Sequence, residues 1–456
     1  MIDAVIERCV GIDVGKKFLS ACVMTGPASG EAKHETRTFG TTAGELEKLR
    51  RWVEEQGCTH AVMESTGAYW KPIFNVLEGT LKVALANPYE VKARKGHKTD
   101  PKDAWWLAHL LRHAMITPSF IPPREQRELR DLTRRRKKMI QAATSEKNRV
   151  EKILEDANVK LGTVLSDVFG VSGQLMLNAL LDGKSDPREV ADFAARRARK
   201  KIPEIIAALE EHRMNDHHRK LIRYSLEHLK FLEEQILDLD EEIRKQIQEA
   251  GYQPCCELLQ TVPGVQETTA AVLLAEMGPD TKQFVDEKHL SSWAGLCPGN
   301  NKSAGRNKSS HTTQGNRWLR AALTECSWGV SKKKGCYLKD RFWRIAAKSR
   351  PKAVVAIAHQ ILILSYCVLQ RGTPYEEQRG VELTESQKNR LIRHHVRRLG
   401  KLGVRVRTNP VAVRPPKCRA TAEISKNAKR TQEVIDNKRL ISKNEPKKRR
   451  KGSQLT

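Results

Sequence analysis

The chain has 456 residues, enough for two or three domains that each bury a core. Its 82 Lys and Arg residues outnumber its 54 Asp and Glu residues, which gives a formal net charge of +28. Such a surplus favours nucleic acid as the partner, because cations bound to phosphates release counterions. The sequence contains no uninterrupted apolar run of membrane-spanning length and no signal-peptide pattern, so it predicts a cytoplasmic protein with no membrane partner.

The N-terminal elements alternate in type after three initial strands. The expected order is strands at 9–14, 18–24 and 35–40, a helix capped by Thr42, a strand ending at Glu64, a helix at 70–77, a strand at 81–86 and a helix from Asp100. Alternating elements of this kind bury a mixed sheet between helices. This order predicts a ribonuclease H-like α/β domain.

Four carboxylates lie at the ends of these elements. Asp13 lies near the end of the first strand, Glu64 ends a later one, and Asp100 and Asp103 lie three residues apart at the expected start of a helix. Hard cations such as Mg²⁺ select carboxylate oxygens and leave room for a phosphate. The four residues therefore predict a magnesium site, whereas for Asp13 alone a turn or capping role is the alternative.

A helical region follows, and it contains a strongly basic run. From about residue 122 to 160, apolar residues recur at helical spacing among Arg and Glu. The run within this helix is Arg134, Arg135, Arg136, Lys137 and Lys138. We expect it to contact phosphates, the alternative being a solvated helix face.

A second long helix is expected over residues 202–250, after small helices at 161–201. Its apolar positions Leu229, Leu232, Ile236, Leu239 and Ile243 alternate at spacings of three and four residues. This spacing is typical of a coiled-coil seam. The seam either joins two chains or folds back within one.

The C-terminal half contains two motifs. Residues 258–265, centred on Val262-Pro263-Gly264, resemble a helix-hairpin-helix, which presents backbone amides to a phosphate. A Gly- and Asn-rich loop then carries Ser303 between Lys302 and Arg306, cations that could bind a phosphodiester and stabilise an attacking alkoxide. A solvated surface loop is the alternative, and Ser309 and Ser310 are rival nucleophiles. The cations predicted to contact nucleic acid here are Lys302, Arg306, Lys308, Arg317 and Arg320.

The remaining C-terminal segments differ sharply in polarity. Residues 353–369 are apolar on most faces of a helix, so we expect that helix to be buried and His359 to be a core residue. Residues 386–451 are crowded with Arg and Lys and poor in aromatic residues, which predicts a disordered or RNA-ordered tail.

Taken together and in this order, the motifs resemble those of the DEDD insertion-sequence transposases, the bridge-RNA-guided recombinases. They are residues 11–16, Met63-Glu64-Ser65-Thr66-Gly67, residues 98–104, the hairpin at 262–264, Ser303, and residues 315–320. The resemblance covers roughly residues 8–375. It implies that Asp13, Glu64, Asp100 and Asp103 are the acidic tetrad, and that Ser303 is the nucleophile that forms a covalent phosphoserine intermediate with DNA.

The resemblance also implies a domain organisation and a set of partners. The domains are a RuvC-like ribonuclease H fold at 1–121, a helical coiled-coil and oligomerisation region at 122–252, a mostly helical transposase domain at 253–378 and a basic tail at 379–456. The implied cofactor is Mg²⁺. The implied partners are double-stranded target and donor DNA, a structured guide RNA that supplies sequence choice by base pairing, and further copies of the chain in a dimer or tetramer. A bacterial, nucleoid-associated protein is expected.

Three other functions are open from the sequence. A RuvC-like nuclease would use water instead of Ser303 at the same tetrad. A noncatalytic nucleic-acid-binding protein would rely on the basic tail and would need neither Asp13 nor Glu64. An actin-like sugar kinase shares the opening Asp-x-Gly strand, but the sequence has no second Gly-rich phosphate-binding hairpin where one is expected.

Overall fold

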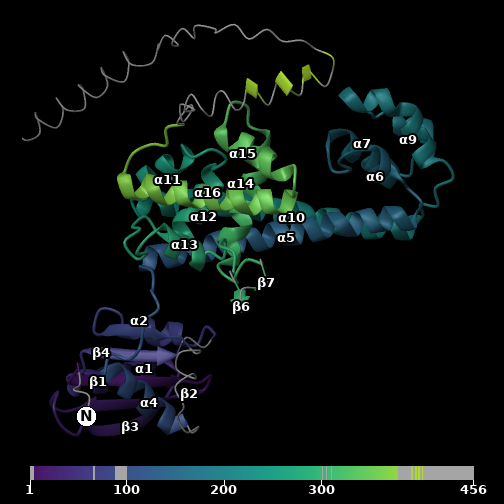
Figure 1. Cartoon of the computed structure of the whole chain (residues 1–456). Helices are drawn as coiled ribbons and strands as arrows, with labels where there is room; N and C mark the ends of the chain where they lie inside the picture. Colours follow the sequence, from purple (N-terminus) through teal and green to yellow (C-terminus); the bar gives the residue numbers. More distant parts are fainter. Residues whose placement is uncertain are drawn as a thin grey trace, which may run out of the picture. The chain divides into compact units, whose positions relative to one another are not determined.

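The computed structural model describes residues 5–64, 67–87, 100–299, 301–303, 306–309 and 311–377, together with 392–393, 396–397, 399–400 and 403 (Figure 1). For residues 100–102 and 301–309 this description is limited to the backbone. The chain divides into two units, residues 1–377 and 378–456. The predicted basic tail lies almost wholly outside the described residues.

The N-terminal domain is built on one five-stranded mixed sheet of order β3-β2-β1-β4-β5. β1 pairs antiparallel with β2, which pairs antiparallel with β3, whereas β4 is parallel to β1 and to β5. The strands and helices are β1 (Arg8–Val14), β2 (Phe18–Thr25), β3 (Lys33–Gly40), α1 (Ala43–Glu55), β4 (His60–Glu64), α2 (Trp70–Leu77), β5 (Lys82–Ala86) and α4 (Asp100–Arg112). The predicted order of elements is confirmed.

The two faces of this sheet are covered by different helices. Val10 and Ile12 of β1 belong to the core cluster that also holds the buried residues of α1 and, from α2, Ile73 and Leu77. Cys9, which points to the other face because side chains alternate along a strand, belongs with Leu107 and Ala108 of α4 to a second cluster. The sheet is therefore enclosed between α1 and α2 on one side and α4 on the other.

The middle region is an antiparallel pair of long helices, α5 (Arg124–Asp156) and α10 (Asp216–Glu249). Leu229 and Leu232 of α10 pack against Met139 and Ala143 of α5. The predicted seam thus packs within one chain, with Ile236 and Leu239 partly buried, so it gives no support to an oligomer. Between the long helices lie α6 (Leu161–Val164), α7 (Val171–Leu181), α8 (Pro187–Ala191), the 3₁₀ helix η1 (Arg196–Lys201) and α9 (Ile202–Leu209).

The prediction of a single helix over 202–250 is wrong. α9 ends at Leu209, and Glu211 adopts a positive φ of 54°, which a continuing right-handed helix does not allow. α10 then begins with a capping box, in which the Asn215 side chain accepts from the backbone of His218 and the His218 side chain accepts from the backbone of Asn215.

The C-terminal region is a helical body with its own core, which includes residues of α11, α12, α14 and α16. Its elements are α11 (Gln253–Gln260), α12 (Glu267–Met277), α13 (Glu287–Trp293), the strands β6 (Asn301–Ser303) and β7 (Arg306–Ser309), α14 (Arg317–Lys332), α15 (Tyr337–Ala346) and α16 (Arg350–Arg371).

Two elements of this body bear on the sequence predictions. α16 is long and apolar enough to cross a membrane by length and composition, but nine of its residues, among them Ile357 and Ile361, are buried in the C-terminal body. His359 is half-buried there, and burial and then Arg341 lower its pKa. The Val262-Pro263-Gly264 turn joins α11 to α12, and Val262 and Pro263 are buried.

Candidate functional site

Two of the four predicted acidic residues lie on the same face of the N-terminal sheet. Asp13 follows Cys9 at an even spacing along β1, and Glu64 follows Val62 along β4, so both occupy the face that α4 covers. β1 and β4 are parallel neighbours with Ile12 opposite Met63. Asp13 and Glu64 therefore lie next to each other at the carboxyl ends of adjacent strands.

A glycine brings α4 directly against β1. A Cβ atom at Gly11 would lie 2.3 Å from both the Ala104 carbonyl oxygen and the Ala108 nitrogen. At the other end of α4, the Arg112 carbonyl accepts from the backbone of Val5 and Ile6. α4 thus runs antiparallel to β1, and its first turn, with Asp103, lies at the same end of the sheet as Asp13.

The donor set at this end fits a hard cation, because it consists of carboxylates. Asp13, Glu64 and Asp103 are each half-buried, and each already has an interaction within the chain. Among the residues that the structure describes, no three His, Cys, Asp or Glu side chains converge closely enough to hold a metal ion. Asp100 is the first residue of α4, and its side chain lies outside the described residues.

Ser303 lies in the C-terminal body, on a short β-hairpin. It ends β6 and pairs with Arg306, the first residue of β7, while Lys302 pairs with Asn307. Lys308 lies on β7. The side chains of Ser303, Lys302, Arg306 and Lys308 lie outside the described residues, as does Ser310.

The base of this hairpin is held by backbone contacts. Gly299 donates to the His311 carbonyl at 2.8 Å, and Pro298 forms a β-bridge with Thr312. A Cβ atom at Gly315 would lie 2.3 Å from the Gly295 nitrogen, so the two chain segments cross in direct backbone contact. Gly295, Gly299 and Gly315 therefore allow close packing at the base of the hairpin.

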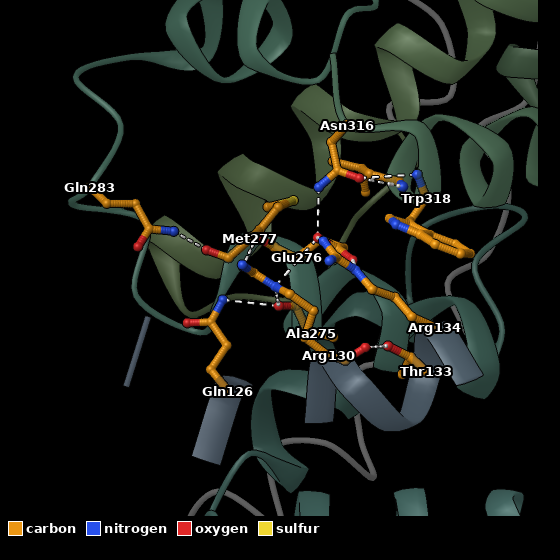
Figure 2. A network of polar contacts seen from close by, with 11 residues as sticks. Gln126, Arg130, Thr133, Arg134, Ala275, Glu276, Met277, Gln283, Asn316 and Trp318 are labelled. Carbon is orange, nitrogen blue, oxygen red and sulfur yellow. Dashed lines mark hydrogen bonds and ion pairs between the residues drawn. The ribbon is translucent and has the colours of Figure 1, made fainter. Parts of the chain in front are cut away.

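A buried carboxylate lies beneath this base. Figure 2 shows Glu276 of α12, whose side chain is 0% exposed, at the centre of a polar network. Arg134 of α5 binds it in a bidentate ion pair at 2.8 and 2.9 Å. Arg130 lies 3.4 Å away and also donates to the carbonyls of Ala275 and Glu276. Burial lowers the pKa of Arg130, an effect that Glu276 opposes.

Asn316 connects this carboxylate to α14. Its side-chain amide donates to Glu276 Oε2 at 2.6 Å, while its Oδ1 accepts from the backbone nitrogens of Trp318 and Leu319 (Figure 2). Its own backbone nitrogen donates to the Trp293 carbonyl. Asn316 therefore caps α14 and joins the end of α13 and the buried Glu276 at one point.

Three members of the basic run form ion pairs within the chain. Besides Arg134, Arg136 forms a bidentate pair with Asp240, and Lys137 pairs with Glu325. Arg135 and Lys138 are exposed. Three of these five cations of α5 thus form ion pairs within the chain, and the other two are exposed.

The two predicted arginines of α14 also differ. Arg317 is exposed, and its guanidinium lies 4.7 Å from the centroid of the Trp318 ring. Arg134 approaches the same ring at 5.7 Å. Arg320 is half-buried and donates to the Gly295 carbonyl at 3.4 Å. Arg320 therefore contacts the base of the hairpin, and Arg317 faces solvent.

Sequence reasoning missed Glu276 and Asn316 as functional-site residues. Asn316 lay within the motif at 315–320 and directly before a helix, which is the position of an N-cap. Glu276 gave only a weak signal, a single carboxylate in the apolar segment 270–277 of α12. A buried charge there implies a cationic partner, but nothing in the sequence identifies Arg134.

Two family models match the chain, and both describe transposases. The model DEDD_Tnp_IS110, described as "Transposase", matches residues 10–159. The model described as "Transposase IS116/IS110/IS902 family" matches residues 256–342. The first segment includes most of the sheet and its acidic residues, and the second includes the hairpin that carries Ser303.

Curated relatives agree with these matches. The chain is 23% identical over 385 residues to the pilin gene-inverting protein of Moraxella lacunata. The aligned region covers 81% of this chain and 97% of that protein. It is 32% identical over 137 residues to the insertion element IS110 uncharacterized 43.6 kDa protein of Streptomyces coelicolor, covering 28% of this chain and 33% of that protein. The Thermus thermophilus RuvC structure matches 25% of this chain and 99% of its own at 13% identity, with a TM-score of 0.21.

Proposed function

Because this chain belongs to the IS110 family of transposases, we propose that it recombines DNA through a covalent phosphoserine on Ser303, assisted by Mg²⁺ and directed by a guide RNA. The observation that supports this proposal best is the pairing of Ser303 with Arg306 across the β6–β7 hairpin. The backbone thus brings a serine and an arginine to opposite positions of one hairpin. A serine hydroxyl can attack a phosphate, and a guanidinium is a group that can stabilise the charge that develops.

The proposed step exchanges one phosphate ester for another. The Ser303 hydroxyl loses its proton, and its oxygen forms a bond to phosphorus. The bond between phosphorus and one deoxyribose oxygen breaks, and that oxygen takes up a proton to become a free hydroxyl. Attack by a different DNA hydroxyl then reverses the step and releases the serine, so strand exchange needs no ATP.

The acidic residues have a supporting role in this proposal. Asp13, Glu64 and Asp103, with Asp100 as the fourth member, would hold Mg²⁺, which when bound polarises a phosphate and stabilises developing charge. Three of them lie at one end of the sheet by strand register and helix direction. Arg306 and Lys302 are the proposed charge-stabilising cations beside the serine.

Rejoining of strands distinguishes a recombinase from a nuclease. Relatives matched over 97% of their length are named pilin gene-inverting proteins, and inversion of a gene requires that cut ends be rejoined. Double-stranded target and donor DNA are therefore the proposed substrates. Several DNA strands must be cut together, so we also propose that the protein assembles into a dimer or tetramer.

We likewise propose the domain boundaries that are expected from the sequence.

This function is tested on a denaturing gel. The reaction contains purified protein, Mg²⁺, end-labelled element DNA and RNA transcribed from the flank of the element. We expect a protein-linked DNA band that disappears in Ser303→Ala and persists in the matched variant Ser309→Ala. Free cleavage products that survive Ser303→Ala would overturn the proposal in favour of a nuclease that uses water.

RNA dependence is tested in the same assay. We expect strand exchange between target and donor only when the flanking RNA is present, and a change of target when the RNA sequence is changed. Exchange that proceeds equally without RNA would overturn the guided part of the proposal and leave the phosphoserine part standing.

A further inference from the structure

Two tryptophans are exposed on adjoining helices of the C-terminal body. Trp328 of α14 is 45% exposed and Trp343 of α15 is 48% exposed. Both indoles contact Phe342, which is fully buried, with ring centroids 5.7 and 5.4 Å apart. The two indoles therefore flank one buried ring across the α14–α15 contact, and Figure 1 shows these two helices side by side.

Both indoles are held by contacts within the chain. Trp343 donates from Nε1 to the Ser331 carbonyl of α14 at 2.9 Å, so its polar group is satisfied within the chain while part of its ring faces solvent. Trp328 is held by its contact with Phe342. A rigid aromatic surface loses little conformational entropy on binding.

Lysine and arginine residues are neighbours of both tryptophans. Lys332 lies four residues after Trp328 on α14, and Lys339 lies four residues before Trp343 on α15, so each lysine is a neighbour of its tryptophan on the helix surface. Lys333 and Lys334 are exposed in the turn between the helices, as is Arg344 beside Trp343. We call the two tryptophans with Lys332, Lys333, Lys334 and Arg344 the α14–α15 patch.

The acidic groups near the patch do not neutralise it. Glu325 of α14 pairs with Lys137 of α5. Glu377 accepts a hydrogen bond from the backbone nitrogen of Tyr337 at the start of α15, and Asp340 is the one carboxylate on α15 itself. No ion pair within the described part of the chain involves Lys332, Lys333 or Lys334. The patch therefore carries a net positive charge around two flat apolar surfaces.

We propose that the α14–α15 patch binds an unpaired stretch of RNA, with bases stacked on Trp328 and Trp343 and phosphates bound by the lysines. Exposed aromatic rings among cations are the combination that binds single strands, because every base has a face that can stack. Duplex DNA keeps its base faces stacked inside the helix, whereas folded RNA offers unpaired bases in loops and bulges. This proposal deepens the RNA dependence proposed above, and its test measures binding without catalysis.

The first experiment measures binding of a fluorescently labelled, unstructured RNA oligonucleotide to the full chain by anisotropy. We expect Trp328→Leu and Trp343→Leu each to weaken RNA binding about tenfold and to leave binding of duplex DNA unchanged. Leucine keeps an apolar contact with Phe342, and the thermal unfolding of each variant checks that the fold is intact. Trp328→Phe, which keeps a flat ring, should restore most of the RNA affinity.

Phe231→Leu is the matched control. Phe231 is 54% exposed on α10, but its neighbours at four residues before and three residues after are the carboxylates Glu227 and Glu234. We expect this variant to bind RNA like the parent. An equal loss of RNA affinity in Phe231→Leu would overturn the assignment of binding to the α14–α15 patch.

The lysines are tested through salt dependence. Each phosphate contact to a single strand contributes about 0.7 to the slope of log affinity against log salt concentration, so replacing Lys332, Lys333 and Lys334 by Gln should reduce the slope by about two. Unchanged RNA affinity in both Trp→Leu variants would overturn the proposal. Tighter, Trp-dependent binding of a DNA oligonucleotide of the same sequence would instead assign the patch to a displaced DNA strand.

Discussion

The side-chain amide of Asn316 donates a 2.6 Å hydrogen bond to the buried carboxylate of Glu276, and the same Asn316 caps α14 through its Oδ1 (Figure 2). Asn316, which follows the hairpin that carries Ser303, thus provides hydrogen-bond partners both to a buried carboxylate and to the backbone nitrogens at the start of α14. Because Arg134 of α5 binds the same carboxylate, the start of α14 is fixed relative to the long helix. The orientation of the hairpin base depends on residues from three helices.

Replacing Glu276 should destabilise the helical part of the protein strongly. Glu276→Ala leaves Arg130 and Arg134 without their buried partner, and breaking such a pair costs about 3 kcal/mol or more. Urea-induced unfolding followed by circular dichroism measures the loss. Glu234→Ala, an exposed carboxylate on α10, should change the free energy of unfolding by less than about 0.5 kcal/mol. Equal stability of the two variants would contradict this role of Glu276.

Two substitutions of Asn316 separate its two bonds. Asn316→Ser keeps an oxygen that can cap α14 but is too short to reach Glu276 as the amide does, whereas Asn316→Ala removes both contacts. We expect the alanine variant to be less stable than the serine variant by about 1 kcal/mol, the usual contribution of an N-cap. Thermal unfolding of both variants provides the comparison, and equal melting temperatures would show that the cap contributes nothing.

Gly11 should not tolerate a side chain. In Gly11→Ala the new Cβ would meet the backbone of Ala104 and Ala108 at 2.3 Å, so β1 and α4 must separate, and overpacking of this kind costs about 1–3 kcal/mol or more. Gly44 in α1 has nothing within 4 Å, so Gly44→Ala should be neutral or stabilising by up to about 1 kcal/mol. Hydrogen exchange of β1 amides in the two variants tests the contrast. Native protection in Gly11→Ala would show that the contact is dispensable.

The acidic end of the sheet is tested by Asp13→Asn and Glu64→Gln. Both changes keep the size of the side chain and remove the charge that the proposed Mg²⁺ needs, so cleavage should fall by about a hundredfold or more while duplex DNA is still bound. Glu55→Gln, an exposed carboxylate at the end of α1, is the control. Full cleavage by Asp13→Asn would favour a noncatalytic role of the sheet.

Stability should decrease as the pH falls below about 6.5. Burial and then neighbouring cations lower the pKa of His109 and of His359 from 6.5, so in acid the unfolded chain binds more protons than the folded chain. Stability therefore rises with pH through this range and is lost as the pH falls. Urea unfolding at several pH values measures the slope, which should be smaller in His359→Gln. A slope of opposite sign would contradict this account.

Much of the N-terminal domain could be predicted from the sequence, because its signals are local. Strands β1 and β4 are short apolar runs, and each carries its carboxylate at the carboxyl end. The helix spacing in α1 and the order of the elements were likewise visible. The end of α9 at Leu209 could not be predicted from the sequence, because the positive φ of Glu211 belongs to a turn that no Gly or Pro marks.

The sequence by itself determined the residue types that we propose for the DNA chemistry: four carboxylates, a serine between cations and an excess of positive charge. Only the tertiary structure decided which long-range partners those charges have. Glu276 meets Arg134 across 142 residues of chain, and Arg136 meets Asp240 across 104. The physical reason is that charge and periodicity are properties of short segments, whereas burial of a charge is acceptable only where packing of distant helices supplies its counter-ion.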